Sequence, residues 1–289
     1  MDIENVPGQV WDLLAAQARQ AAAANQPVLG TVDDYFYDHI YRRWTADFNP
    51  INYQSNQQGV IDVGWADLAR QWAPGSSAKA GPGDQSKGLQ AMQADAGDPS
   101  HRGTRLGEKY SNQPTVSRFQ FLVGSGGGIV LLNRMRRACQ LYIAQHRGTV
   151  VQWWKVFGES FAEQGQSDAC VVYLLKPYDD PLVLEFIDGY LWPNIRDIVN
   201  DRFVPVGLVR IGGRPLWATW IPSRSKWSNV FGAGTLNTHY GSAGGLMGLV
   251  FGNAFARAVR TRTALDNVSN AVLITAAKIE ARRIIRSLE

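Results

Sequence analysis

A run of β-branched and aromatic residues between two glycines, GTVVQWWKVFGES at residues 148–160, constrains the fold more than any other stretch. Such a run predicts a buried strand over residues 149–157. Residues two apart in a strand share a face, so Lys155 points to the same side as Trp153. Burying an ammonium group is costly unless a partner or a ligand anion meets it. Two interpretations of Lys155 stay open: its amine reaches water near a strand edge, or it serves proton chemistry or phosphate binding.

Composition and charge exclude several classes of protein. With 289 residues, 45% of them hydrophobic and 19% charged, the chain can fill the core of one large domain or two small ones. Its net charge of +4 is compatible with a partner that carries phosphates. No dense Lys/Arg run with interleaved aromatics occurs, which disfavours nucleic acid as a partner. No uninterrupted apolar run approaches about 18 residues, so we expect no membrane partner.

The cysteines and the first residues bear on metal binding and location. Cys139 and Cys170 lie in apolar contexts and are expected to be buried free thiols. Neither has a zinc-like spacing with histidine, so no metal site is expected. The first residues, MDIENVPGQVWDLL, lack a cationic and then apolar segment. We therefore expect no secretory signal and a cytoplasmic location.

The N-terminal part of the chain is predicted to be helical. An alanine-rich helix is expected over residues 7–25, and a second over 35–44 with Asp33 and Asp34 as its N-cap pair. The second helix carries an aromatic stripe expected to dock against the rest of the protein. Together these define an N-terminal helical portion, residues 1–72. Residues 73–104 are rich in Gly, Pro, Ser and Asp and predict a mobile loop or linker.

Residues 105–289 are predicted to form an α+β domain that contains the active site. Five strands are expected, at residues 116–123, 149–157, 168–176, 206–211 and 215–220. Helices are expected at residues 129–145, 180–199, 243–262 and 268–288, with a polar loop at 221–240. The predicted fold class is therefore α+β, with N-terminal helices followed by a mixed or antiparallel sheet of about five strands flanked by helices.

Three local features in this part carry their own expectations. The loop GSGGG at residues 124–128 lacks the Lys-Ser/Thr ending of a P-loop and the spacing of a dinucleotide fingerprint, so nucleotide binding there is weakly supported. The glycines at the start of helix 243–262 would let another backbone approach closely. The arginines of helix 129–145 are expected to form a solvated face; they are Arg134, Arg136 and Arg137.

The order of these pieces over residues 115–260 resembles the Hop-A effector-like family, which includes plant-pathogen type III effectors and the lyase partners of lanthipeptide and thioamitide gene clusters. The likeness is carried by RFQFLVG before a helix, WWKVFG with its lysine, SDACVVYLLK, and RIGGRPLWATWIPS leading through a Gly-rich loop into AGGLMGLVFGNAFARA. The early segment DDYFYDHIYRRW also fits. The resemblance covers roughly half of the chain.

The resemblance implies a reaction and its partners. In the peptide-modifying members, a separate kinase phosphorylates Ser or Thr in a ribosomally made precursor peptide. The Hop-A-like protein then removes the phosphate by β-elimination and leaves dehydroalanine or dehydrobutyrine. It implies a precursor peptide and a cognate kinase as partners, and no metal or cofactor.

The residue types in this sequence suit such a reaction. Lys155 is the candidate base for the α-proton, since a lysine with a lowered pKa removes protons near neutrality. His239, or Tyr240 beside it, is the candidate acid for the leaving oxygen. Asp168 could pair with a nearby cation or cap a turn. Cations must hold the phosphate, and the candidates are Arg118, Arg210, Arg214, Arg224 and Lys226.

One departure from the family pattern keeps alternatives open. The lyase branch carries a His-Arg pair before the late helix, where this chain has Ala243 and Gly244. Either the acid has moved to another position, or another arginine binds the phosphate, or catalysis has been lost. In the last case the protein would be a non-catalytic type III effector or a protein-binding module that uses the aromatic helix 35–44 and the loop 73–104.

Overall fold

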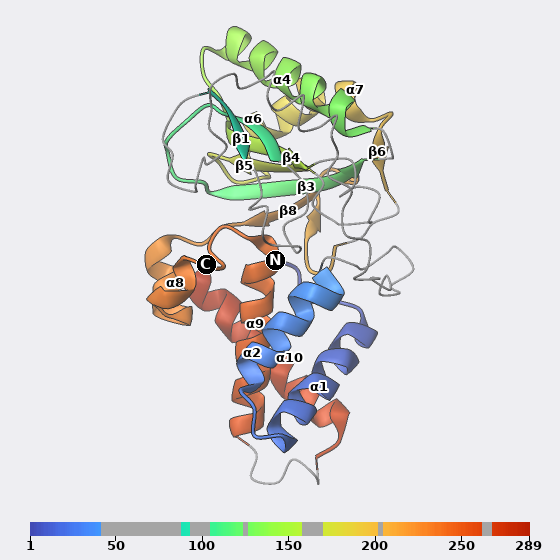
Figure 1. Ribbon diagram of the computed structural model, residues 1–289, viewed down its shortest axis with the longest axis vertical. Helices are drawn as coiled ribbons and strands as arrows, with labels where there is room; N and C mark the ends of the chain where they lie inside the picture. The colour runs from blue at the N-terminus through green and yellow to red at the C-terminus, as the bar shows by residue number, and fades with distance from the viewer. Residues whose placement is uncertain (42–87, 93–104, 124–126, 158–169, 202–204, 262–267) are drawn as a thin grey trace. The chain divides into compact units, whose positions relative to one another are not determined.

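The computed structural model describes residues 1–41, 88–92, 105–123, 127–157, 170–201, 205–261 and 268–289 (Figure 1). The chain forms two compact units. The helical unit comprises residues 1–51, 205–209 and 221–289, and the sheet unit comprises residues 52–204 and 210–220. The closing segment thus clusters with the N-terminal helices, an association that the sequence analysis did not anticipate. The predicted boundary at residue 72 lies outside the described residues and stays a prediction.

The sheet unit is built on antiparallel strands, and the predicted α+β fold class is confirmed. The strand order is β1-β2-β4-β5-β3-β8-β7, and β6 pairs with β3 beside this path. The sheet has more strands than the five expected, because short strands lie where none was predicted; β1 falls within the predicted loop 73–104. The strands are β1 Gly88–Met92, β2 Arg105–Lys109, β3 Ser117–Val123, β4 Val151–Phe157, β5 Cys170–Leu174, β6 Val199–Asn200, β7 Val209–Arg210 and β8 Trp217–Trp220.

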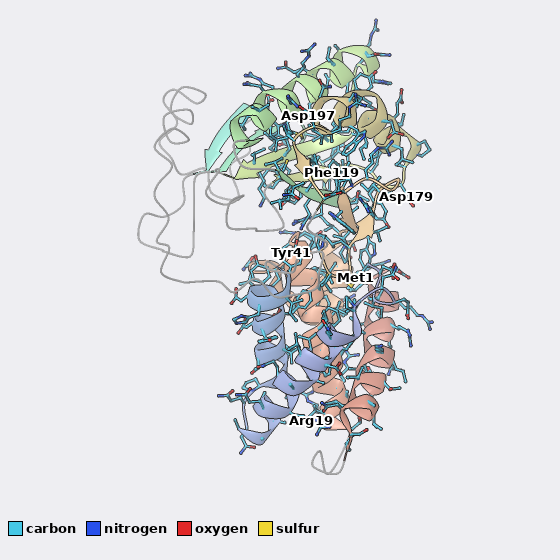
Figure 2. All side chains as sticks on the ribbon, turned by 90° about the vertical axis from the view of Figure 1, so that its right-hand side faces the viewer. Met1, Arg19, Tyr41, Phe119, Asp179 and Asp197 are labelled. Atoms are coloured by element: carbon cyan, nitrogen blue, oxygen red, sulfur yellow. The ribbon has the colours of Figure 1, made fainter. Side chains whose placement is uncertain are left out.

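Helices cover one face of this sheet (Figure 1). They are α4 Gly127–His146, α6 Pro181–Glu185, the π-helical turn η2 Phe186–Leu191, and α7 Trp192–Ile195. Asp180 caps α6 by accepting a hydrogen bond from the Leu182 amide at 2.9 Å, and Pro181 follows it at the first helical position. The core between sheet and helices includes Phe119 (Figure 2) and the buried free thiols Cys139 and Cys170, as predicted.

The helical unit is organised around α9, Ala243–Arg260. Phe251 of this helix packs edge-on against Trp11 at 5.1 Å between ring centres and lies 4.8 Å from Phe36. Aromatic pairs of this kind contribute about 0.5–1.5 kcal/mol beyond the area they bury. The helices around α9 are α1 Gly8–Ala23, α2 Val28–Tyr35, the π-helical turn η1 Phe36–Tyr41, and α10 Asn270–Leu288. Helix α8, Arg224–Phe231, packs on α10. The 3₁₀ turn η3, Ala233–Leu236, packs on α8.

Two local predictions in this unit are wrong. Asp33 and Asp34 do not cap a helix: α2 begins at Val28, after Pro27, and both aspartates lie within it. The predicted polar loop 221–240 contains α8, because Ser223 accepts a hydrogen bond from the Lys226 amide. Trp227 of α8 is buried, which anchors the helix. The remaining closing helices begin and end close to the predicted residues.

Glycines on α9 let α2 approach closely, as predicted from the Gly-rich start of the helix. Gly248 and Gly252 lie four residues apart and therefore on one side of α9. A Cβ at residue 252 would lie 2.6 Å from the backbone oxygen of Leu29. A Cβ at residue 248 would meet the carboxylate of Asp33. Side chains at these positions would force the two helices apart.

Among the described residues, none of the helices combines the length and the hydropathy that a membrane crossing requires.

Replacing Gly252 tests this close approach. Gly252→Ala should lower the free energy of unfolding by about 1–3 kcal/mol, because the added methyl group meets a backbone oxygen that cannot rotate away. Gly30→Ala in α2 is the matched control: its Cβ would meet nothing within 4 Å. That control should be neutral or stabilising by up to about 1 kcal/mol, since alanine favours helix. Urea denaturation followed by tryptophan fluorescence measures both, and equal effects would contradict the packing described.

Candidate functional site

Alternation along neighbouring strands places a set of polar and aromatic side chains on one face of the sheet. Trp154 and Val156 of β4 point into the helix-covered core, so Lys155 points to the opposite face. β4 lies between β2 and β5, so Lys155 is not on an edge strand. We call this opposite face the lysine face, and its side chains are Trp153 and Lys155 of β4, Val171 and Tyr173 of β5, Arg118 and Gln120 of β3, and Trp217 and Thr219 of β8.

Strand register brings two cations of the lysine face to one aromatic ring. Tyr173 pairs with Trp153 on one side and Arg118 on the other. Its ring stacks on Trp153 at 4.2 Å with an interplanar angle of 6°. The Lys155 ammonium lies 5.5 Å from the centre of the Trp153 indole and 5.7 Å from that of Tyr173, and the Arg118 guanidinium lies 5.4 Å from Tyr173. Such contacts favour a cation by about 0.5–2 kcal/mol.

Arg118 is a buried cation on a central strand. It is only 3% exposed, and its Nη2 donates a hydrogen bond to Oε1 of Gln120 at 2.6 Å. Gln120 is itself fully buried. Burying a guanidinium is costly unless its donors are satisfied and its charge is balanced. The fold therefore holds a positive charge in a fixed place beside Lys155, which is partly exposed.

The register also shapes the space next to Lys155. Gly107 of β2 stands directly opposite Lys155 in the antiparallel ladder. A glycine has no side chain to lay across its cross-strand neighbour. Gly107 is buried, and a Cβ there would meet the backbone oxygen of Trp154, so the glycine lets β2 approach β4 closely at this pair.

Two further arginines predicted to bind phosphate, Arg210 and Arg214, have partners on different faces of the sheet. Arg210 stacks over Trp217 of the lysine face, with 5.6 Å from the guanidinium carbon to the ring centre. Arg214 instead forms an ion pair with Asp188 at 2.8 Å, on the π-helical turn η2 that covers the opposite face. The structure therefore associates Arg210 with the lysine face and engages Arg214 with the helix layer. Asp168 lies outside the described residues.

The other predicted residues lie in the helical unit. The Tyr240 hydroxyl donates a hydrogen bond to the Pro222 carbonyl at 3.0 Å, and the Arg224 guanidinium stacks on the Tyr240 ring at 5.2 Å. Burial raises the pKa of Tyr240 above its ordinary value. Lys226 donates a hydrogen bond to the backbone oxygen of Glu289. The expectation that these groups and the lysine face act on one substrate stays a prediction.

A carboxyl–imidazole pair in the helical unit was not predicted from the sequence. Nε2 of His239 lies 3.7 Å from Oδ2 of Asp33, and Asp33 is 5% exposed. The other oxygen, Oδ1, has no hydrogen-bond partner within the described ranges and lies against Gly248. A pair of consecutive aspartates is also typical of a helix cap, so this pattern does not single out the buried member. The apolar neighbours Val32 and Phe36 at helical spacing are the signal for a buried position at Asp33.

Burial perturbs both groups of this pair. It raises the pKa of Asp33 to about 7, with a further contribution from the negative charge of Asp34. It lowers the pKa of the partly buried His239 below 6.5. Near neutrality about half of the Asp33 side chains therefore carry a proton beside a largely neutral imidazole. Such a pair can deliver a proton, which is the role expected of the acid at His239.

Within the part of the chain that the structure describes, no group of three or more His, Cys, Asp or Glu side chains is placed to hold a metal ion.

Comparison with known proteins gives structural similarities at low sequence identity. No protein-family model and no curated protein matches the chain. It is similar to the effector protein from Pseudomonas syringae pv. syringae, at 14% identity and a TM-score of 0.45 over 94% of this chain and 93% of that chain. It is likewise similar to the effector protein from Pseudomonas syringae pv. tomato, at 13% identity and a TM-score of 0.46 over the same shares.

A third similar structure is the type III effector/phosphothreonine lyase OspF from Shigella flexneri. The identity is 11% and the TM-score 0.28, and the match covers 53% of this chain and 85% of that chain. At TM-scores below 0.5, these similarities assign no function to this chain.

The raised pKa of Asp33 predicts a pH-dependent stability. Asp33 keeps a proton in the folded protein that the unfolded chain releases above its ordinary pKa of 3.8. The contribution of Asp33 to the free energy of unfolding should therefore fall as the pH rises from about 4 to 7, by a few kcal/mol, and stay level above that.

Asp33→Asn should remove this dependence and raise the stability at pH 8 relative to the parent protein. Asp34→Asn, at the exposed neighbouring position, should keep most of it, because burial is the larger cause of the raised pKa of Asp33, and serves as the control. Urea denaturation of the three proteins at several pH values measures the difference. Parallel stability curves for the parent and Asp33→Asn proteins would contradict the burial of a protonated carboxyl group.

Proposed function

We propose that the protein is a phospho-Ser/Thr lyase that removes phosphate by β-elimination from a ribosomally made precursor peptide. The observation that carries this proposal is the lysine face, where a partly exposed ammonium and a buried guanidinium share the ring of Tyr173. The resemblance of residues 115–260 to the Hop-A effector-like family supports the same reaction. The expected cytoplasmic location and the cognate kinase belong to this proposal.

The reaction needs a base, a phosphate site and an acid. A base takes the proton from the α-carbon, and the electron pair of that C–H bond forms the double bond between the α- and β-carbons. The bond between the β-carbon and the phosphate oxygen breaks, and phosphate leaves. The products are a dehydroalanine or dehydrobutyrine residue and inorganic phosphate, so no oxidant, metal or cofactor is required.

Lys155 is suited to the role of base in this reaction. It stands at the middle of an interior strand, so the sheet fixes its backbone, and its side chain is partly exposed on the lysine face.

Arg118 is suited to hold the phosphate. A guanidinium whose position is fixed by burial and by Gln120 does not need to reorganise as negative charge grows on the leaving oxygen. Such preorganisation is a main source of transition-state stabilisation. Arg210 at the Trp217 end of the same face is the second candidate.

Tight packing at residues 243 and 244 is compatible with an acid that lies at another position of the chain. A Cβ at Gly244 would lie 2.5 Å from a ring carbon of Tyr41, so this packing excludes an arginine there. Ala243 is 1% exposed and equally enclosed. His239 packs against the start of α9 and pairs with Asp33, which gives it a proton source. We assign the acid to His239, with Tyr240 as the alternative.

Incubation with a phosphorylated precursor peptide tests the proposed reaction. The peptide treated with its kinase should lose phosphoric acid when the protein is added, and the unphosphorylated peptide should stay unchanged. Mass spectrometry detects the loss, and addition of a thiol to the new double bond confirms the product. An intact phosphopeptide after prolonged incubation would reject the lyase and would favour a non-catalytic binding module.

Lys155→Ala should lower kcat/KM for elimination by about 10²–10⁴-fold, because general-base catalysis contributes factors of that size. Lys176→Ala is the matched control: this lysine lies in the same unit, and its half-exposed ammonium pairs with Asp180 at 3.5 Å. The control should keep the parent activity. Elimination at the parent rate by a folded Lys155→Ala protein would show that another group is the base.

A further inference from the structure

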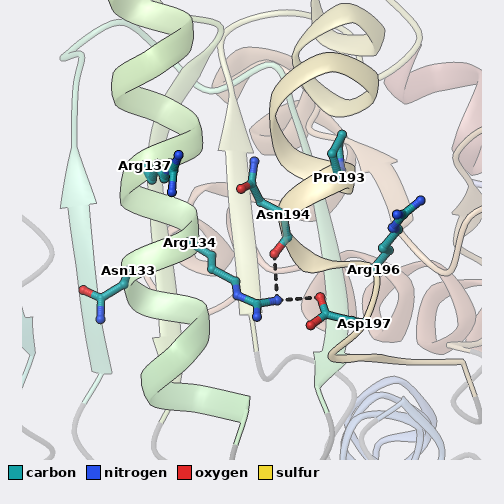
Figure 3. Close-up of a pocket in the computed structure, with 7 residues that line it drawn as sticks. All are labelled: Asn133, Arg134, Arg137, Pro193, Asn194, Arg196 and Asp197. Atoms are coloured by element: carbon teal, nitrogen blue, oxygen red, sulfur yellow. Dashed lines mark hydrogen bonds and ion pairs between the residues drawn. The ribbon is translucent and has the colours of Figure 1, made fainter.

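A charged groove lies between α4 and α7, on the helix-covered side of the sheet and so on the side opposite the lysine face (Figure 3). Its volume is about 500 Å³. Arg134 and Arg137 line it from α4, and Arg196 and Asp197 line it from the end of α7. Three guanidinium groups and one carboxylate therefore leave two net positive charges in the groove. The sequence predicts a solvated face for the arginines of α4, and Arg137 is exposed, but the opposing wall at the end of α7 has no local sequence signal.

One end of the groove already shows how a carboxylate is held there. Nη1 of Arg134 donates hydrogen bonds to Oδ1 of Asp197 at 2.5 Å and to the backbone oxygen of Asn194 at 2.9 Å. The bond from Arg134 lowers the pKa of Asp197, which is therefore charged at neutral pH. A charged hydrogen bond of this kind is about twice as strong as a neutral one. Arg134 is thus matched by a carboxylate from the protein itself.

The other end of the groove carries charge that is not matched in this way. Arg137 and Arg196 are exposed and stand on opposite walls, and the Asn194 side chain lies between them (Figure 3). Among the described residues, neither guanidinium has an ion pair. Each of these exposed guanidinium groups offers forked donors of the type that binds a carboxylate or a phosphate. The Asn194 side-chain amide donates a hydrogen bond to the Tyr190 backbone oxygen at 2.5 Å, which leaves its Oδ1 to accept one from a ligand.

We propose that this groove binds an acidic segment of a peptide, whose carboxylates pair with Arg137 and Arg196 while its backbone contacts the Asn194 side chain. The lining supports a peptide rather than other anions. Small-molecule sites are mostly apolar, whereas this lining is mostly charged and amide side chains. Among the described residues that line the groove there is no aromatic ring on which a nucleic-acid base could stack.

Fluorescence anisotropy with a labelled peptide of alternating glutamate and serine tests the proposal. The double variant Arg137→Ala, Arg196→Ala should weaken binding by about tenfold or more, since two charge-assisted contacts are removed. Arg283→Ala, at an exposed arginine of α10, is the matched control and should bind like the parent protein. A peptide with glutamine in place of glutamate should bind weakly to all of them.

The variant Asp197→Asn is expected to bind the glutamate peptide more tightly than the parent protein. Misfolding cannot produce such a result, because it weakens binding. Removing this carboxylate releases Arg134 for the ligand and raises the net charge of the groove, so the glutamate peptide should bind about threefold or more tightly.

Unchanged binding in the double variant, or weaker binding in Asp197→Asn, would overturn the proposal. Displacement of the peptide by equimolar inorganic phosphate would show a simple anion site, and tighter binding of a single-stranded oligonucleotide would show a nucleic-acid site; either result overturns the peptide assignment. Because the readout is binding, it is independent of lyase activity.

Discussion

The aromatic ring of Tyr173, with a cation on either side, is the interaction on which the functional architecture of the sheet depends. The pairing register of the strands places Tyr173 in this position, opposite Arg118 of β3 on one side and Trp153 of β4 on the other. The helix-covered face of the same strands provides the apolar burial that stabilises the unit, so the opposite face can carry charge. A lysine and an arginine placed in this way make a fixed positive surface. Fixed charge costs little reorganisation when a substrate develops negative charge, and the elimination that we propose for this face depends on that property.

The helical unit shows a second consequence of close packing. Glycines on α9 let α2 approach until the Asp33 carboxyl group is enclosed, and enclosure raises its pKa. The same glycine-rich segment leaves little space for a side chain at Gly244, because a Cβ there would meet the rings of Tyr41 and Tyr37. His239 packs on the start of α9, and its Nε2 lies 3.7 Å from Oδ2 of Asp33, so an imidazole stands beside a carboxyl group of raised pKa. The glycines of α9 thus account both for the close packing of α2 and for the raised pKa of Asp33.

The sequence predicted long periodic elements well and local polar structure poorly. The strand that contains Lys155 and the helix α9 could be recognised because their apolar spacing extends over two or more turns or alternations. Arg118 could be selected as a strand residue, but its burial depends on pairing with β5 and β8, which only the fold determines. Asp33 was misassigned because a pair of aspartates also fits a helix cap. The α4–α7 groove joins residues about 60 apart in the sequence and has no local signal.

Selective chemical labelling of lysines is the measurement that tests the central claim most directly. Acylation of surface amines at low reagent concentration, read by peptide mass spectrometry, reports how accessible each ammonium group is. With a phosphothreonine peptide present, labelling of Lys155 should fall while labelling of Lys176 stays the same, because the phosphate and its peptide cover the lysine face. Equal labelling of Lys155 with and without the phosphopeptide, at concentrations that saturate binding, would contradict the assignment of this face to the substrate.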